Sequence, residues 1–125
     1  MIVLDASALM ALLLREPGQE VVAEHVAEAA ISAVNLAEVL ARMAREQISS
    51  RFLLPKLEAL GLTVVEFDQP QAVIVSDIRE YARSYGVGLA DCCCIALALH
   101  RAWPVITADR VWTTLGFEID VSLIR

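Results

Sequence analysis

Four acidic side chains interrupt apolar stretches of the sequence, namely Asp5, Glu38, Asp91 and Asp109. Carboxylates that converge repel one another, and two unit charges 4 Å apart cost about 4 kcal/mol at an effective dielectric constant of 20. A divalent cation removes that cost, and all-oxygen ligands with waters left over suit Mg²⁺ or Mn²⁺. Such an ion activates water and neutralises the charge that develops on a phosphodiester, so hydrolysis of that bond would need no lysine or histidine base.

Each acid also has a purely structural interpretation. Asp5, Asp91 and Asp109 lie where a helix could begin, and an acidic side chain there caps the helix or interacts favourably with its dipole. Glu38 could extend into water or pair with Arg42, four residues further along the same helix. The set as a whole favours a shared site, because three of the four lie where an α/β fold would bring them together.

The elements that must position these acids alternate between short β-rich runs and helices. The expected strands are residues 2–5, 30–32, 63–67, 104–107 and 117–120, and the expected helices are residues 6–15, 19–29, 34–47, 51–60, 70–85, 89–102 and 109–115. This alternation predicts a single α/β domain over residues 1–125, with a parallel sheet covered by helices on both faces. Such sheets place their sites at the carboxyl ends of the strands, near a topological switch point.

Composition sets further limits. Hydrophobic residues make up 58% of the 125 residues and the net charge is −6, which excludes disorder and a strongly basic nucleic-acid coat. Cys92, Cys93 and Cys94 are adjacent and odd in number, so they predict small buried residues in a reducing compartment rather than disulfides. No apolar run is long enough to span a bilayer, and we expect a soluble cytoplasmic protein.

Four short motifs carry the acids in order along the chain: Ile-Val-Leu-Asp5-Ala-Ser7, Ser32-x-x-Asn35-x-x-Glu38, Gly88-Leu-Ala-Asp91 and Thr107-Ala-Asp109-Arg110. Their order, their spacing and the chain length resemble PIN-domain ribonucleases, most closely the VapC-like toxins of type II toxin–antitoxin pairs. The resemblance covers essentially the whole chain. It implies a five-stranded parallel sheet in a three-layer α/β/α arrangement, Mg²⁺- or Mn²⁺-dependent endoribonuclease activity, and neutralisation by a cognate antitoxin.

The resemblance also implies a role for each acid. Asp5 and Asp91 match the central metal ligands of the family. Glu38 matches an acid that binds metal directly or through water. Asp109 matches a fourth acid, which supports a second metal or orients water.

Three uncharged residues match positions that hydrogen-bond the acids or the waters of the metal, namely Ser7, Asn35 and Thr107. Such contacts orient the ligands of a metal site. Each residue also has a structural interpretation, as a first-turn hydroxyl, a helix-start residue and a strand-end residue respectively.

The net charge of −6 is unfavourable for RNA, whose binding depends on neutralising phosphates. A bound metal would offset the four acids, and three arginines could supply local positive charge. Arg110 lies beside the predicted site, whereas Arg42 and Arg45 lie beyond Glu38 on the same helix. A solvated helix face is the alternative for these arginines.

Two helices, residues 34–47 and 51–60, carry more apolar residues than one face of each should bury. These are Leu36, Val39, Leu40, Met43, Phe52, Leu53, Leu54 and Leu57. The excess predicts a groove between the two helices that takes an amphipathic antitoxin segment, or a surface that pairs with a second copy in a homodimer.

Two further function classes are compatible with the sequence. A non-catalytic binding module on the same fold would use the acids only as structural residues. A phosphoryl-transfer protein of the receiver or aspartyl phosphatase type would need a lysine near the acidic strand ends. The only lysine, Lys56, lies in a predicted helix, and Ser7 stands where such a phosphatase has its second aspartate.

Overall fold

A computed structural model describes residues 1–125 and contains one five-stranded, fully parallel sheet. The strands are β1 (Ile2–Leu4), β2 (Ala29–Ser32), β3 (Thr63–Val65), β4 (Val105–Thr107) and β5 (Val121–Leu123). Their order across the sheet is β3-β2-β1-β4-β5. The register places Val3 of β1 between Ala30 of β2 and Val105 of β4.

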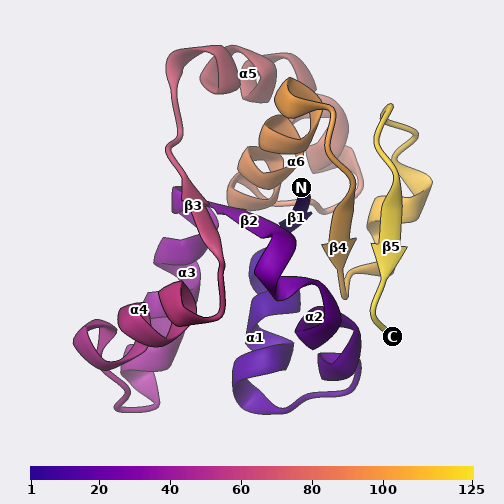
Figure 1. Cartoon of the computed structure of the whole chain (residues 1–125). Coiled ribbons are helices and arrows are strands. Elements are labelled where there is room, and N and C mark those ends of the chain that lie inside the picture. Colours follow the sequence, from indigo (N-terminus) through magenta and orange to yellow (C-terminus); the bar gives the residue numbers. More distant parts are fainter.

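Helices cover both faces of this sheet, as Figure 1 shows. They are α1 (Ala6–Leu14), α2 (Gln19–His25), α3 (Ala33–Arg45), α4 (Ser50–Ala59), α5 (Gln69–Ser84) and α6 (Leu89–Arg101), with short 3₁₀ helices η1 (Val26–Glu28) and η2 (Arg110–Thr114). The predicted α/β class, with a parallel sheet between helical layers, is therefore confirmed. None of the helices is long and apolar enough to cross a membrane.

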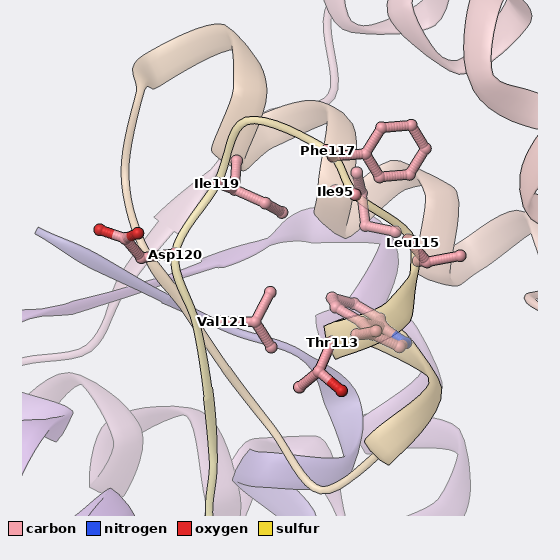
Figure 2. A pocket seen from close by; sticks show the side chains of 9 residues that line it. Ile95, Thr113, Leu115, Phe117, Ile119, Asp120 and Val121 are labelled. Carbon is pink, nitrogen blue, oxygen red and sulfur yellow. The ribbon is translucent and has the colours of Figure 1, made fainter.

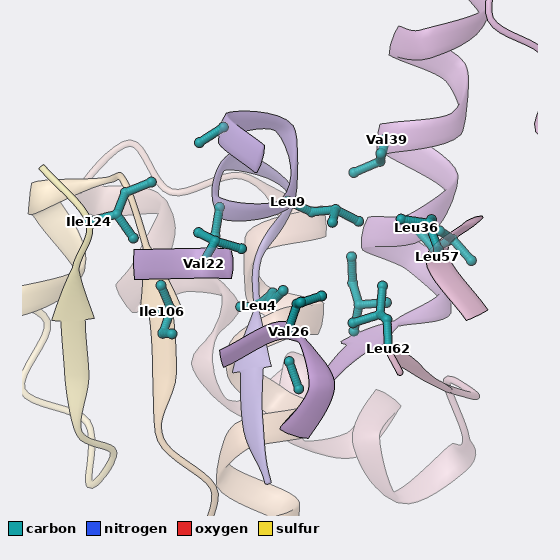
Figure 3. Packing of buried hydrophobic residues seen from close by; sticks show 14 of the residues in the cluster. Leu4, Leu9, Val22, Val26, Leu36, Val39, Leu57, Leu62, Ile106 and Ile124 are labelled. Carbon is teal, nitrogen blue, oxygen red and sulfur yellow. The ribbon is translucent and has the colours of Figure 1, made fainter. Parts of the chain in front are cut away.

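One hydrophobic core lies between the sheet and the helices α1 to α4 (Figure 3). Leu4 and Ile106 contribute from neighbouring strands, and Leu9 contributes from α1. Gly18, which precedes α2, allows the end of the chain to pack here: its φ is +94°, and a Cβ atom at this position would lie 2.4 Å from the carbonyl oxygen of Ile124. A glycine is the residue that this approach requires.

A second core lies on the other face, where α5 and α6 pack together against β1 and β4. Seven consecutive residues of α6, from Cys92 to Ala98, are buried. A helix that is apolar on all sides is one that is enclosed by the protein. The three cysteines are free thiols inside this helix, as the sequence predicted.

The expected strand at residues 117–120 was wrong, because the last strand is β5 at Val121–Leu123. Phe117 and Ile119 have the apolar alternation of a strand, but they pack partly buried against the second core. The Ile119 N–H donates to the Phe117 carbonyl at 2.8 Å, which turns the chain away from the sheet. Pairing begins only at Val121, opposite Val105.

The expected groove between residues 34–47 and 51–60 is also largely filled. Five of the eight apolar residues there are buried, namely Leu36, Val39, Met43, Leu53 and Leu57. Of these eight apolar residues, only Phe52 and Leu54 are exposed, at 59% and 41%, and both lie on α4. The two helices bury their apolar faces in the first core, so less surface remains for a partner than the count of apolar residues indicated.

Candidate metal centre at the carboxyl edge of the sheet

The chain reverses its direction across the sheet beside β1. The strands β2 and β3 follow on one side of β1, and β4 and β5 lie on the other. The boundary between β1 and β4 is therefore a topological switch point, which is where open parallel sheets bind ligands. Asp5 directly follows β1, and Thr107 ends β4.

Asp5 is buried at this point, with 2% of its surface exposed, and it accepts hydrogen bonds on both carboxylate oxygens. The Thr107 hydroxyl donates to Oδ2 at 2.6 Å, and the Ser7 hydroxyl donates to Oδ1 at 2.7 Å. The Ala8 N–H also donates to Oδ1, at 2.8 Å, so that Asp5 caps α1. Asp5 thus caps a helix, which was the structural interpretation of this residue, and its carboxylate is held in one orientation.

Ser7 and Thr107 extend this network to Asp109. The Ala108 N–H donates to the Ser7 hydroxyl oxygen at 2.9 Å, and the Asp109 N–H donates to the Thr107 hydroxyl oxygen at 3.0 Å. Asp109 itself caps η2, because its Oδ1 accepts from the Val111 N–H at 3.0 Å. The two strand ends are therefore connected by polar side chains, and the two carboxylates lie at the same edge of the sheet.

Asn35 links Glu38 to the start of α6. Its side-chain nitrogen donates to Glu38 Oε2 at 3.0 Å and to the carbonyl oxygen of Ala90 at 3.1 Å. Both partners are acceptors, so the amide orientation is fixed by its contacts. The remaining atom, Asn35 Oδ1, is buried and has no hydrogen-bond partner. A buried acceptor without a partner marks a position that a water or a ligand can fill.

Glu38 does not form the expected pair with Arg42. Arg42 Nε instead lies 3.5 Å from Glu46 Oε1. Glu38 is exposed on α3, and its one hydrogen bond to a side chain comes from Asn35. This leaves most of its carboxylate available to the solvent side of the site.

Asp91 is half-buried in the first turn of α6, where it is the third residue after the N-cap Gly88. The nearby backbone N–H of Gly88 favours the ionised carboxylate and acts to lower the pKa of Asp91. Burial, followed by repulsion from Asp5, Glu38 and Asp109, raises the pKa of Asp91 to about 6. All three other predicted acids therefore act on Asp91 through space.

Asp5 is subject to the same forces. Burial raises the pKa of Asp5, the hydrogen bonds from Thr107, Ser7 and Ala8 oppose that rise, and repulsion from Asp109 adds to it. Burial also raises the pKa of the Cys94 thiol well above its usual range, and the charges of Asp5 and Asp91 add to this effect. The structure thus brings the four predicted acids into one region, above the fully buried thiol of Cys94.

This donor set fits a hard divalent cation that keeps several waters. No three carboxylate, histidine or cysteine side chains are arranged so that they alone could hold one metal ion. Mg²⁺ is usually bound by one or two carboxylates, and the remaining positions are filled by water and substrate phosphate. The repulsion among the acids and the unpartnered Asn35 Oδ1 are consistent with an ion and its waters at this edge.

A groove of about 360 Å³ adjoins the acids and runs between α1 and α3. It is lined by Ala6, Ser7, Met10, Leu14, Glu16, Glu38, Arg42 and Arg45. Arg110, the other predicted basic residue, is exposed next to Asp109 and does not line this groove. Another pocket of about 190 Å³ lies beside η2 and β5 (Figure 2), and it contains none of the predicted site residues.

Sequence reasoning missed three participants in the site. Gly88 was named only as part of a motif, although its spacing from Asp91 is that of an N-cap and the third helical residue, so its place as the N-cap of α6 could have been predicted. The carbonyl of Ala90 carries no sequence signal, because any residue supplies one. Met10 lines the groove from a helix that reads as uniformly apolar, so nothing distinguishes it from its neighbours.

Comparison with known proteins identifies the family. A model of the PIN domain matches residues 2–118, whereas no curated protein matches the sequence. DNA-bound VapBC from Salmonella typhimurium contains a chain with a TM-score of 0.75 and 21% identity, covering 99% of this chain and 98% of that one.

Two further structures are similar over nearly the whole chain. A toxin–antitoxin complex from Klebsiella pneumoniae gives a TM-score of 0.75 at 16% identity, with 100% of this chain and 98% of that chain covered. FitAcB from Neisseria gonorrhoeae gives a TM-score of 0.68 at 25% identity, with 99% and 98% covered. The resemblance read from the four acidic motifs is confirmed, and the chain belongs to the PIN-domain family.

Proposed function

We propose that this protein is a divalent-metal-dependent endoribonuclease that acts as the toxin of a toxin–antitoxin pair. The observation that carries the proposal is the hydrogen-bond network at the carboxyl edge of the sheet, where Ser7 and Thr107 connect Asp5 to the Asp109 backbone and Asn35 connects Glu38 to the first turn of α6. Burial and repulsion from Asp5, Glu38 and Asp109 also raise the pKa of Asp91 to about 6. Four carboxylates at a switch point destabilise a metal-free protein, and an ion that binds there offsets this repulsion. Membership of the PIN-domain family supports a nuclease.

Mg²⁺ or Mn²⁺ would supply a reactive water at neutral pH and would offset the negative charge that builds up on the phosphodiester. Asp5 and Asp91 would hold the ion most directly, with Glu38 as a further ligand or through water. Asp109 would support a second ion or orient water at the same edge.

The remaining residues keep these carboxylates in place. Ser7 and Thr107 fix both oxygens of Asp5, and their hydroxyl donors favour the charged form of the carboxylate. Asn35 holds Glu38 on one side and the first turn of α6 on the other, so it fixes the separation between Glu38 and Asp91. Arg110 lies beside Asp109 and would meet a phosphate of the RNA.

The proposal includes a cognate antitoxin, because the structural neighbours include VapBC and a toxin–antitoxin complex. Phe52 and Leu54, exposed on α4, are available for an amphipathic segment of that partner or for a second copy of this chain. The three free thiols support a reducing compartment such as the cytoplasm.

A non-catalytic binding module is the second candidate, and the caps made by Asp5 and Asp109 favour it. In that case the acids would serve α1 and η2 alone. Phosphoryl transfer of the receiver type is not supported, because Lys56 lies on α4 over the ring of Phe52 at 4.6 Å and outside the acidic region.

Cleavage of end-labelled single-stranded oligoribonucleotides by the purified chain, in EDTA, Mg²⁺ or Mn²⁺, tests the proposal. We expect cleavage only with metal, and a loss of at least about 100-fold in Asp91→Asn. Asp77→Asn is the matched control, because Asp77 is exposed on α5 away from the acids. Metal-independent cleavage, or equal activity in both variants, would contradict the proposal. No cleavage of any RNA together with an unchanged melting temperature in Mg²⁺ would favour the binding module.

A further inference from the structure

The groove between α1 and α3 has a basic side that none of the acidic motifs accounts for. Arg42 and Arg45 line it together with Ser7 and Glu38, two residues of the proposed site. A smaller hollow next to it is lined by Glu38, Ala41, Arg42 and Arg45. Both hollows therefore share the same edge of α3, and that edge runs from an acid of the site to two guanidinium groups.

The order of these side chains along α3 suits a bound polyanion that extends from the acidic site along the helix. At a rise of 1.5 Å per residue, Arg42 lies about 6 Å along the helix from Glu38, and Arg45 lies about 10 Å from it. A single RNA strand carries a phosphate on every nucleotide. A strand with one phosphate at the acids would therefore place its following phosphates along this edge.

Both arginines have donors to spare. Arg45 forms no ion pair, and Arg42 contacts Glu46 only through Nε, at 3.5 Å and with both side chains nearly half exposed. A pair this exposed contributes little and is readily exchanged for another anion. The two terminal nitrogens of each guanidinium can bind phosphate oxygens in a bidentate manner.

The helix dipole alone does not explain why arginines occupy positions 42 and 45 at the end of α3. A basic residue in the last turn of a helix interacts favourably with the helix dipole, which favours Arg42 and Arg45 as a general preference. The dipole does not explain why both line a groove that opens on the acids. Glu16 also lines the groove, at the opposite wall, so the cationic side is confined to α3.

We propose that Arg42 and Arg45 bind successive phosphates of the substrate strand on one side of the cleaved bond, which fixes the path of the RNA along α3. This inference rests on the proposed function, since it takes RNA as the polyanion. It assigns these residues to positioning rather than to the chemical step, and it explains how a protein with a net charge of −6 can hold a nucleic acid. A protein segment in the same groove is the competing occupant.

The test is the salt dependence of RNA binding. The probe is a fluorescein-labelled, single-stranded 12-nucleotide RNA of mixed sequence, bound in Mg²⁺ to the Asp91→Asn protein and followed by fluorescence anisotropy between 50 and 200 mM salt. The logarithm of the binding constant K decreases as the logarithm of the salt concentration rises. For single strands the steepness of this decrease becomes smaller by about 0.7 for each phosphate that the protein no longer neutralises. We expect a decrease of that size for Arg42→Gln or Arg45→Gln, and about twice that for the double variant.

Arg83→Gln is the matched control, because Arg83 is also exposed in the last turn of a helix and pairs with an acid of its own helix, Glu80. It lies on α5, and we expect its slope to equal that of the parent. Arg45→Lys should restore the slope, because a lysine keeps the charge. In the parent background, the arginine variants should raise KM for cleavage far more than they lower kcat.

Two results would overturn the inference. One is a salt slope in the double variant that equals the slope of Arg83→Gln, which would leave the groove to a protein partner. The other is a fall in kcat without a change in KM. Because cleavage by the parent is measured separately, a chain that cleaves RNA but shows no arginine effect refutes the inference alone. A chain that does not cleave refutes the proposed function.

Discussion

At the scale of single residues, the effect of the neighbouring acids is clearest in the pKa of Asp91. In the unfolded chain an aspartate titrates near pH 4, whereas burial and three nearby acids raise the pKa of Asp91 to about 6 in the folded protein. The folded state therefore holds the extra proton between these values. Stability that is present below about pH 4 is lost as the pH rises through 6, and above pH 6 the ionised group destabilises the fold.

Asp91→Asn should remove this pH dependence. In EDTA at pH 7 we expect the variant to gain about 1 kcal/mol in its free energy of unfolding, a value reduced from the full shift because Asp91 is partly exposed to solvent. The gain should disappear below pH 4. Urea unfolding from pH 3.5 to 7.5 checks this, with Asp77→Asn as the control. A variant less stable than its parent at pH 7 would show that Asp91 acts mainly as a helix cap.

The residue types at the site were predictable, but their partners were only partly so. An acid after a strand that precedes a helix was expected to be either a cap or a ligand, and Asp5 caps α1 while lying among the other acids. The two interpretations are compatible, because one carboxylate has lone pairs for both. The alternative pair of Glu38 with Arg42 failed, since spacing of four residues also joins Arg42 to Glu46.

At the scale of elements, the connection between α3 and α6 depends on one buried amide. Asn35 reaches the carbonyl of Ala90 across 55 residues of sequence and holds Glu38 with the same nitrogen. Helix packing alone would leave these two helices free to adjust by small amounts. The amide fixes them at the point where the acids meet.

Asn35→Leu keeps the volume and removes both hydrogen bonds. We expect a loss of roughly 1–3 kcal/mol in the free energy of unfolding, because the Ala90 carbonyl loses its donor. We also expect a smaller increase in melting temperature on adding Mg²⁺, because Glu38 is no longer held. Gln71→Leu is the control: Gln71 is an equally buried amide that donates to the Glu66 carbonyl at 3.0 Å, and it forms no hydrogen bond to any of the four acids. It should lose stability and keep the full effect of Mg²⁺; equal effects of both variants would contradict the role of Asn35.

Element types followed from the sequence more reliably than element ends. The pattern of residues 117–120 is as strand-like as that of residues 121–123, and local alternation cannot choose between them. The choice depends on which segment reaches Val105, and that is a contact across the sheet. The same limit explains why spacing alone could not predict the strand order, and with it the position of the switch point.

At the scale of the whole molecule, helices on both faces bury every residue of β2 and β4, whereas the edge strands β3 and β5 contain no buried residue. The interior of the sheet is therefore apolar, and the polar side chains of the site lie where the central strands end. The alternation of strands and helices was enough to predict this arrangement. The position of the groove was not predictable, because it depends on how α1 and α3, two helices that are not adjacent in the sequence, pack side by side.

The rate at which a reagent modifies the three thiols of α6 would measure how often the second core becomes transiently exposed to solvent. A thiol reagent can modify Cys92, Cys93 or Cys94 only when α6 is uncovered, because all three are buried and burial raises the pKa of each thiol. We expect the three to react together in native buffer, at a rate set by how often the second core opens. Mg²⁺ should slow that rate in the parent and leave it unchanged in Asp91→Asn, as followed by mass spectrometry. Fast modification of one thiol ahead of the others would show that α6 loosens locally while the rest of the molecule stays closed.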